Sequence, residues 1–264
     1  MIKVVTLSSS SKGNCVLIIG EQTNMLIDAG INISNLIEKL KLLSVEPSSI
    51  KAILSTHEHS DHTKSIGGLM RKYGCMLYCH TDGRDAVVSK IGNVNQKQVV
   101  EFFNSEFNVG EFVIKPFKLP HDSVSCVGYK ITCGHNSFAY ATDLGFASDE
   151  TIENLKNCKL VILESNHDEK MVINNLNYSD QLKRRILSRH GHLSNMASAK
   201  VVCVLAQHNV KQVVLAHLSE ENNTPELCYQ TVCEYLDAMG IMPGVNIKID
   251  VAPAKTLGTV FVLK

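Results

Sequence analysis

The sequence has no excess of charge of either sign and no long apolar segment. Lysine and arginine together number 26, as do aspartate and glutamate. No overall positive field therefore attracts nucleic acid, although a local basic patch remains compatible with this balance. No apolar run reaches the roughly 18 residues of a membrane-spanning helix, and residues 1–5 do not open the apolar stretch of a signal peptide. We therefore expect a cytoplasmic protein without membrane contact.

Paired cysteines are also missing. The nine cysteines include no CxxC spacing, and most have apolar neighbours, as Cys203 does in Val-Val-Cys-Val-Leu. This distribution favours buried free thiols in a reducing compartment over disulfides.

The sequence lacks low-complexity tracts and fixed-period repeats, and apolar patterns predict strands and helices alternating through one domain, residues 1–264. This order indicates layered sheets with helices outside, an α/β architecture. Ser34 is the expected N-cap of the first helix, and Ser8–Asn14 the expected polar turn between the first two strands. The predicted strands are 2–7, 15–19, 24–27, 51–55, 76–79, 111–119, 125–132, 137–142, 159–163, 211–216, 246–251 and 258–263. The predicted helices are 34–43, 65–73, 83–90, 149–156, 179–189, 194–207 and 224–238.

The feature that points to chemistry is the segment His-Glu-His-Ser-Asp-His at 57–62, which follows the predicted strand 51–55. Imidazole nitrogen and carboxylate oxygen are ligands that zinc, manganese and iron accept. His57 and His59 are separated by one residue and can point the same way, while Asp61 and His62 can serve a second ion. Four ligand-type residues at fixed positions are far more typical of a metal site than of a His-rich surface loop.

Two ions need more ligands than this segment supplies, and three further candidates each follow a predicted apolar strand. They are His121 after strand 111–119, Asp143 after strand 137–142 and His217 after strand 211–216. Singly, each is more typical of a loop or a cap. Together with the 57–62 segment, they predict a two-metal centre.

The motifs, in their order along the chain, resemble those of the metallo-β-lactamase superfamily. The resemblance rests on Met-Leu-Ile-Asp-Ala-Gly at 25–30, the 57–62 segment, His121, Asp143 and His217, and it spans nearly the whole chain. It implies a four-layer αββα sandwich with two divalent metal ions, zinc, manganese or iron, at the edge between two sheets. It also implies that Asp28 supports the ligand loop from behind, or else is a simple turn carboxylate. The implied ligands are His57, His59 and His121 for one ion, Asp61, His62 and His217 for the other, and Asp143 for both.

The fold alone does not fix the reaction, but two further motifs favour a phosphodiester substrate. Leu-Glu-Ser-Asn-His at 163–167 and His-Gly-His-Leu-Ser-Asn at 190–195 resemble elements of tRNase Z-type nucleases. The resemblance implies that Glu164 and His192 together protonate the leaving oxygen. A metal-bridging hydroxide, assisted by Asp61, would attack phosphorus. Ser194, at a predicted helix N-terminus, can contact a phosphate or simply cap the helix.

The chain has no Gly/Pro-rich arm of the tRNase Z kind and no domain inserted between Asp143 and His217. Residues 7–16 and 216–223 instead resemble the compact bacterial WalJ (YycJ) group, which implies a DNA 5′-to-3′ exonuclease with DNA as its partner. Asn14, in the Ser8–Asn14 turn, is then a candidate contact for substrate, with an ordinary hairpin turn as the alternative.

Two other functions stay open at this point. One is a small-molecule metallohydrolase acting on a lactone, a thioester or a cyclic nucleotide. The other is a metal-binding regulatory protein without catalysis. Five histidines lack the pattern of a ligand at a strand end, and most of them are expected at the surface or behind the ligands: His80, His135, His167, His190 and His208.

Overall fold

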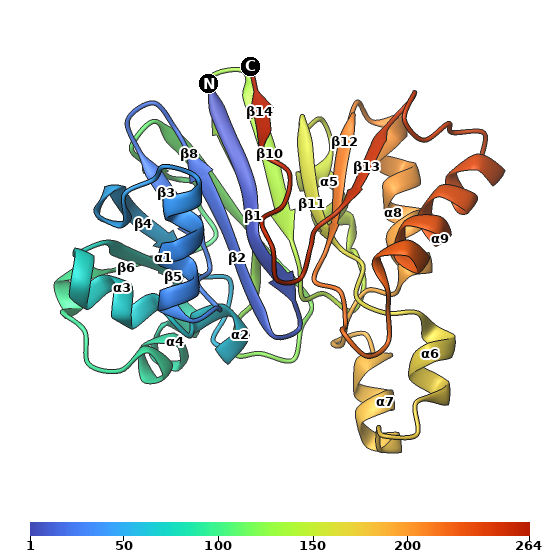
Figure 1. Ribbon diagram of the computed structural model, residues 1–264, viewed down its shortest axis with the longest axis horizontal. Helices are drawn as coiled ribbons and strands as arrows, with labels where there is room; N and C mark the ends of the chain where they lie inside the picture. Colours follow the sequence, from blue (N-terminus) through green and yellow to red (C-terminus); the bar gives the residue numbers. More distant parts are fainter.

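The computed structural model describes residues 1–264 and contains two seven-stranded sheets packed face to face, with helices outside both (Figure 1). This is the predicted αββα sandwich. In spatial order, the first sheet contains β14 (Phe261–Leu263), β1 (Ile2–Ser10), β2 (Gly13–Ile19), β3 (Asn24–Ile27), β4 (Ile50–Leu54), β5 (Met76–His80) and β6 (Val99–Phe102). The second sheet contains β13 (Lys248–Val251), β12 (Gln212–Ala216), β11 (Leu160–Glu164), β10 (Asn136–Ala141), β9 (Val127–Cys133), β8 (Phe112–Lys118) and β7 (Phe107–Val109).

The helices form the two outer layers. Against the first sheet pack α1 (Ile33–Leu42), α3 (Ile66–Tyr73) and α4 (Arg84–Ile91). Against the second pack α5 (Asp149–Leu155), α8 (Asn195–Gln207) and α9 (Pro225–Ala238). The short α2 (Ser60–Thr63) lies in the loop after β4, while α6 (Glu169–Asn174) and α7 (Asp180–Ile186) project together at the lower right of Figure 1.

Three apolar layers hold the sandwich together. The central strands are buried on both faces, which explains why they read as continuous apolar runs. In β4, Ala52 and Leu54 belong to the core between the sheets, whereas Ile53 belongs to the core under the helices of the first sheet. Across the middle layer, the Tyr129 hydroxyl donates to the carbonyl of Ser55 at 2.5 Å. This bond ties β9 to the chain just before the histidine segment.

Each sheet combines antiparallel and parallel pairing, and the parallel strands position the site. The pairs β3–β4 and β4–β5 are parallel in the first sheet, as are β10–β11 and β11–β12 in the second. The carboxyl ends of parallel strands lie at one edge of a sheet, where ligand sites commonly form. Asp28, the 57–62 segment, Asp143 and His217 all follow such ends.

The predicted turn at Ser8–Asn14 is wrong. β1 runs to Ser10 and β2 begins at Gly13, so only two residues form the turn. Ser8, Ser9 and Ser10 pair with β2 and are buried, and Ser8 also donates through Oγ to the carbonyl of Ala254 at 2.6 Å. A pattern of small polar residues predicts a loop, but contacts far along the sequence make these residues a strand.

Other differences are smaller. The N-cap of α1 is Asn32, not Ser34. The edge strands β6 and β7 and the helix α6 were not predicted from the sequence. All nine cysteines are free thiols and seven are buried, as predicted. None of the helices has the length and apolarity required to cross a membrane.

Candidate active site

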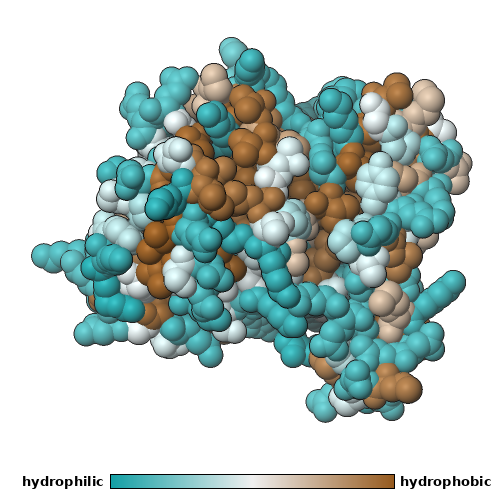
Figure 2. Space-filling model, in the orientation of Figure 1, coloured by the Kyte–Doolittle hydropathy of each residue, from teal (hydrophilic) through white to brown (hydrophobic).

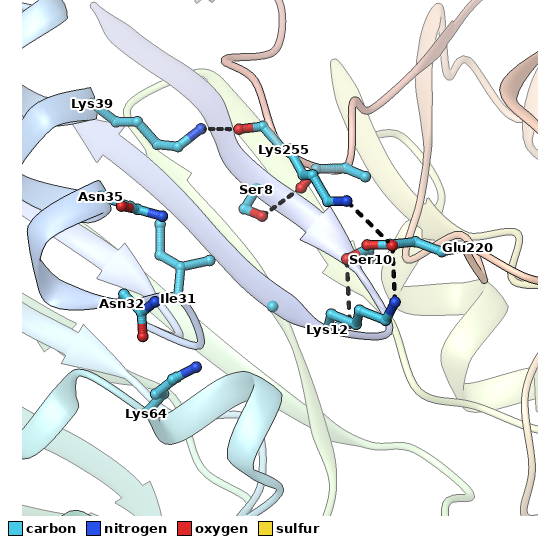
Figure 3. A pocket seen from close by; sticks show the side chains of 12 residues that line it. Ser8, Ser10, Lys12, Ile31, Asn32, Asn35, Lys39, Lys64, Glu220 and Lys255 are labelled. Carbon is cyan, nitrogen blue, oxygen red and sulfur yellow. Dashed lines mark hydrogen bonds and ion pairs between the residues drawn. The ribbon is translucent and has the colours of Figure 1, made fainter.

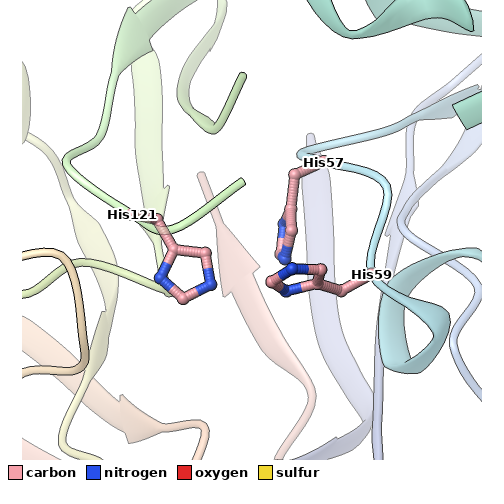
Figure 4. A group of neighbouring side chains, drawn as sticks. All are labelled: His57, His59 and His121. Carbon is pink, nitrogen blue, oxygen red and sulfur yellow. The ribbon is translucent and has the colours of Figure 1, made fainter. Parts of the chain in front are cut away.

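The 57–62 segment and the loop after β8 bring three imidazoles together. Ligand nitrogens of His57, His59 and His121 all lie within 4.8 Å of one another. Figure 4 shows the three rings converging from opposite sides, with His57 and His59 on one loop and His121 on the other. His57 and His121 are buried. This group has the composition of a three-histidine metal site.

A second group lies beside the first. Ligand atoms of Asp61, His62 and His217 also lie within 4.8 Å of one another. Asp143 lies between the two groups, because its Oδ1 is 3.6 Å from Nε2 of His121 and 3.6 Å from Nε2 of His217. Its Oδ2 is 3.2 Å from Nε2 of His62. The seven candidate ligands named from the sequence therefore form one cluster.

The ring nitrogens are arranged as metal ligation requires. His62 Nδ1 donates to Asp28 at 2.7 Å, His217 Nδ1 donates to Glu164 at 2.7 Å, and His121 Nδ1 donates to the carbonyl of Gly191 at 3.1 Å. Each of these rings therefore has its Nδ1 bonded outward and turns its Nε2 toward the cluster, where that nitrogen can bind a metal ion in place of a proton. An outer partner of this kind is usual for a metal-binding histidine.

Several inward-facing atoms of the cluster have no hydrogen-bond partner. Nε2 of His57, His121 and His217 and Oδ2 of Asp143 are buried without one. Buried polar atoms are nearly always satisfied in native proteins. A group of orphaned nitrogen and oxygen acceptors around one point therefore fits bound cations.

Burial and neighbouring charges shift the pKa values of several groups in the cluster. Burial would raise the pKa of Asp143, but the positive charges of His217 and His62 hold that pKa well below its usual range. Burial disfavours the charged form of His217, yet the negative charge of Asp143, with Asp61 and Glu164, raises its pKa to about 10. In contrast, burial lowers the pKa of His57 well below its usual value. The carboxylates are thus ionised at neutral pH, and cations can replace the protons on neighbouring imidazoles.

Asp28 holds the histidine segment from behind, as the resemblance implied. Its carboxylate accepts from the Thr56 backbone N–H at 2.9 Å and from the Thr56 hydroxyl at 2.8 Å. The Thr56 oxygen is then free to accept from Nδ1 of His57, 3.0 Å away. Gly30 permits this close packing, since a Cβ there would stand 1.5 Å from the carbonyl oxygen of Asp61. The role of Thr56 as a link between Asp28 and His57 was not predicted from the sequence, because it depends on how the loop folds.

Glu164 organises more of the site than the sequence indicated. Its Oε1 accepts from Nδ1 of His192 at 2.9 Å as well as from Nδ1 of His217, and its Oε2 accepts from the backbone N–H groups of Leu144 and Leu193 at 3.0 and 2.9 Å. Burial would raise its pKa, but the positive charges and hydrogen bonds of His192 and His217 lower it to about 2. One ionised carboxylate therefore joins the strand ends of β10, β11 and β12 and the His192 loop.

The environment of His192 suits a proton donor. Burial disfavours its charged form, but the negative charge of Glu164 outweighs this and raises its pKa. Because Nδ1 is bonded to Glu164, Nε2 is the nitrogen left to donate. The side chain is 22% exposed, and its ring centre lies 5.1 Å from that of His121 and 5.3 Å from that of His217.

Two predicted substrate contacts have other partners in the structure. Asn14 is buried, and its Nδ2 lies 3.1 Å from Nε2 of His62 and 3.4 Å from Oδ2 of Asp61. Ser194 is the N-cap of α8, accepts from the Ala197 N–H at 3.3 Å and donates to Glu169 at 2.8 Å. Asn14 thus positions metal-ligand candidates, and the capping role of Ser194 is confirmed.

Two of the histidines that lack a ligand pattern, His80 and His167, are buried. His80 ends β5 and lies with its ring nitrogens 3.2 Å from Asn104 and Ser125. His167 is buried with neither ring nitrogen bonded, and burial lowers its pKa to about 4. The sequence offered no signal for either arrangement.

Two hollows adjoin the cluster. The first, of about 170 Å³, is lined by Lys12, Lys39, Lys64 and Lys255, with Glu220 as its only carboxylate (Figure 3). We call it the lysine pocket. The second, of about 310 Å³, includes His192 in its wall, together with residues of α7. Figure 2 shows mostly hydrophilic residues over the lower half of this face of the molecule.

Comparison with known proteins agrees with this geometry. Residues 23–218 match a family model described as a beta-lactamase superfamily domain. The chain is 33% identical to exodeoxyribonuclease WalJ of Streptococcus pneumoniae over 95% of this chain and 94% of that protein. It is 31% identical to exodeoxyribonuclease YycJ of Bacillus anthracis over 92% of both chains.

Solved structures show the same fold at lower identity. The metallo-beta-lactamase fold protein YhfI from Bacillus subtilis superposes with a TM-score of 0.72 at 19% identity, covering 97% of this chain and 98% of that one. The short form of human tRNase Z superposes with a TM-score of 0.66 at 16% identity, covering 98% and 100%. By motif, fold and sequence identity alike, the chain belongs to the beta-lactamase superfamily, with the WalJ and YycJ proteins among its relatives.

Proposed function

We propose that this protein is a metal-dependent exodeoxyribonuclease that removes nucleotides from the 5′ end of DNA. The observation that carries the proposal is the Glu164–His192 pair, a proton donor fixed directly beside the ligand cluster, with His192 Nδ1 3.7 Å from Oδ1 of Asp143. A cleft built in this way can hydrolyse an ester whose leaving oxygen needs a proton. The names of the two bacterial relatives supply the substrate class, DNA.

The ligand geometry supports two divalent ions, whether zinc, manganese or iron. His57, His59 and His121 would hold one, and Asp61, His62 and His217 the other, with Asp143 between them. When bound, such ions lower the pKa of a water molecule toward neutrality and offset the negative charge of a phosphodiester.

The protein's own groups handle the protons. Asp61, ionised and 23% exposed, accepts a hydrogen bond from the attacking water and orients it. As the water oxygen bonds to phosphorus, one of the water's protons passes to solvent, and the bond from phosphorus to the 3′-oxygen breaks. His192 donates its proton from Nε2 to that oxygen, and the Glu164 carboxylate stabilises the histidine while it is charged.

The lysine pocket supports a polyanionic substrate. Lys39 and Lys64 form no ion pair with a carboxylate, while Lys12 and Lys255 share Glu220 at 3.0 and 3.4 Å. The pocket lies next to the cluster, since Gly13 in its wall precedes Asn14 and Lys64 follows His62 by two residues. Although the protein has no net charge, positive charge is concentrated where the backbone of a bound strand would pass.

The test is a substrate panel run with metal analysis on the same preparation. End-labelled single- and double-stranded DNA, RNA, bis(p-nitrophenyl) phosphate and a lactone are incubated with Mn²⁺ or Zn²⁺. We expect linear DNA to be shortened from its 5′ end, closed circular DNA to resist, and the His59→Ala, Asp61→Ala double variant to be inactive while folded.

Other outcomes would overturn the proposal. Hydrolysis of the lactone without action on nucleic acid would indicate a small-molecule hydrolase. Full nuclease activity in the double variant would remove the metal cluster from the mechanism.

A further inference from the structure

The cavity that contains His192 is separate from the lysine pocket and has a different lining. We call it the His192 cavity. It measures about 310 Å³, within the range of small-ligand sites. Leu182, Arg185 and Ile186 lie at positions i, i+3 and i+4 of α7, so one face of this helix forms a wall. Tyr178, just before α7, adds an aromatic ring.

The opposite wall belongs to the catalytic edge. It includes His192 and Asn166, and Asn166 Nδ2 donates to the carbonyl of His217 at 2.8 Å. Ser11, at the turn between β1 and β2, also lines the cavity. The cavity therefore extends from the proton donor to the projecting α6–α7 hairpin seen in Figure 1.

The lining combines the groups that a nucleotide requires. The ring of Tyr178 and the carbon surfaces of Leu182 and Ile186 can pack against a base and a sugar. Arg185 donates to Asp122 through Nε, and its two terminal guanidinium nitrogens have no hydrogen-bond partner. The Arg185 side chain is 58% exposed. Those nitrogens can bind a phosphate in the two-point manner typical of arginine.

We propose that the His192 cavity binds the 5′-terminal nucleotide of the DNA strand, with Arg185 on its 5′-phosphate. This inference rests on the proposed function. His192 gives its proton to the departing 3′-oxygen, so the nucleotide that carries this oxygen must lie on the His192 side. With α7 as a wall, the volume of about 310 Å³ suits a single small ligand, and we take that nucleotide to be the end of the strand. Hydrolysis then leaves a nucleotide with a 3′-hydroxyl here and a 5′-phosphate on the shortened strand.

The first test fills the cavity. Leu182→Trp places a large ring inside it, and Leu176→Trp is the matched control because Leu176 is 97% exposed between α6 and α7. Activity is measured on 5′-phosphorylated DNA and on bis(p-nitrophenyl) phosphate, which carries no nucleotide. We expect the ratio of DNA to ester activity to fall at least tenfold in Leu182→Trp and to stay unchanged in the control. Ile186→Trp is a second filling variant if the first does not fold.

The second test measures binding without turnover. Deoxyadenosine 5′-monophosphate is the probe, titrated by calorimetry into the metal-loaded wild type, Leu182→Trp and Leu176→Trp. We expect binding in the wild type and the control and its loss in the filled variant. No binding to the wild type would overturn the inference.

The third test concerns the phosphate. Arg185→Ala is compared with Arg184→Ala, a neighbouring exposed arginine that does not line the cavity, and metal content is checked in both. We expect only Arg185→Ala to lose the preference for 5′-phosphorylated over 5′-hydroxyl ends, by about tenfold. Equal behaviour of both variants would overturn the assignment of Arg185.

The proposed function and this inference fail in different ways. If the wild type hydrolyses the ester but no DNA, the function is wrong and the cavity has no strand end to bind. If the wild type shortens DNA while Leu182→Trp and Leu176→Trp share one activity ratio, the function stands and only the inference is wrong.

Discussion

Replacing Glu164 with glutamine should damage both stability and catalysis, because this carboxylate serves four donors at once. Its oxygens accept from Nδ1 of His192 and His217 and from the N–H groups of Leu144 and Leu193. Glutamine offers one oxygen and one NH₂ group. Whichever way the amide turns, its NH₂ faces two donors, and two hydrogen bonds are lost in a fully buried position.

The expected loss of stability can be estimated from those two hydrogen bonds. A hydrogen bond to a charged group contributes about 1.5–3 kcal/mol, and breaking a buried charged network costs about 3–5 kcal/mol. For a chain of this length, each kcal/mol shifts the melting temperature by about 2–4 °C. We therefore expect Glu164→Gln to melt on the order of 10 °C lower, and kcat to fall by about 10²-fold or more as proton donation is lost.

The assay is thermal unfolding of the metal-free variant followed by kinetics with metal restored. Glu169→Gln is the matched control, since Glu169 is exposed and bonds only the Ser194 hydroxyl. A melting temperature within 2 °C of the wild type would refute the view that Glu164 joins the strand ends.

Three further outcomes are expected. Asp28→Ala frees His62 Nδ1 and should weaken metal affinity by about 10–100-fold in a chelator competition assay, whereas the exposed Asp82→Ala should not. Because Glu164 raises the pKa of His192, activity falls as pH rises through that pKa, and Glu164→Gln should move the fall to lower pH; an unmoved basic limb in the pH–rate profile counts against the pair. Free Mn²⁺ at about 1,000 times its Kd should stabilise the protein by about 4 kcal/mol per site, so an identical melting temperature with and without EDTA argues against metal binding.

The candidate ligands could be named from the sequence because their signal is local. They lie in the loops that follow apolar strands, so a strand end and a ligand-type residue are close together in the chain. The alternation of strands and helices predicted layered sheets with helices outside, and the resemblance of the motifs implied the four-layer αββα arrangement. The short edge strands β6 and β7 were not predicted, because they contain only four and three residues. That is too few for a periodic pattern of apolar residues to be recognised.

Partners far apart along the chain could not be predicted. Ser9 reads as a turn residue, yet its Oγ accepts from the backbone N–H of His217 at 2.8 Å, 208 positions away. The sequence motifs predict Glu164 as a partner of His192 alone, yet Glu164 also accepts from Nδ1 of His217. Such contacts depend on which strands the sheet places side by side, and no local pattern encodes that.

The backbone of the site is strained at three residues, and the cost of that strain is met by contacts distant in the sequence. Asp28, Asp143 and His217 have φ values of 56°, 64° and 59°, in the left-handed region that favours glycine. Each costs on the order of 1–3 kcal/mol and persists only where the surroundings enforce it. All three directly follow or lie two residues beyond a parallel strand, where a sharp turn aims the side chain along the sheet edge.

This strain, and the repulsion among crowded ligands, must be offset by the packing of one sheet on the other. The first sheet supplies Asp28 and the 57–62 segment, while the second supplies His121, Asp143 and His217. Neither sheet alone completes either group of candidate ligands around Asp143. The apolar layer between the sheets therefore sets the separation of the ligands, and cations held by both sheets would in turn stabilise that packing. A core variant that shifts one sheet against the other would change metal affinity without touching a ligand.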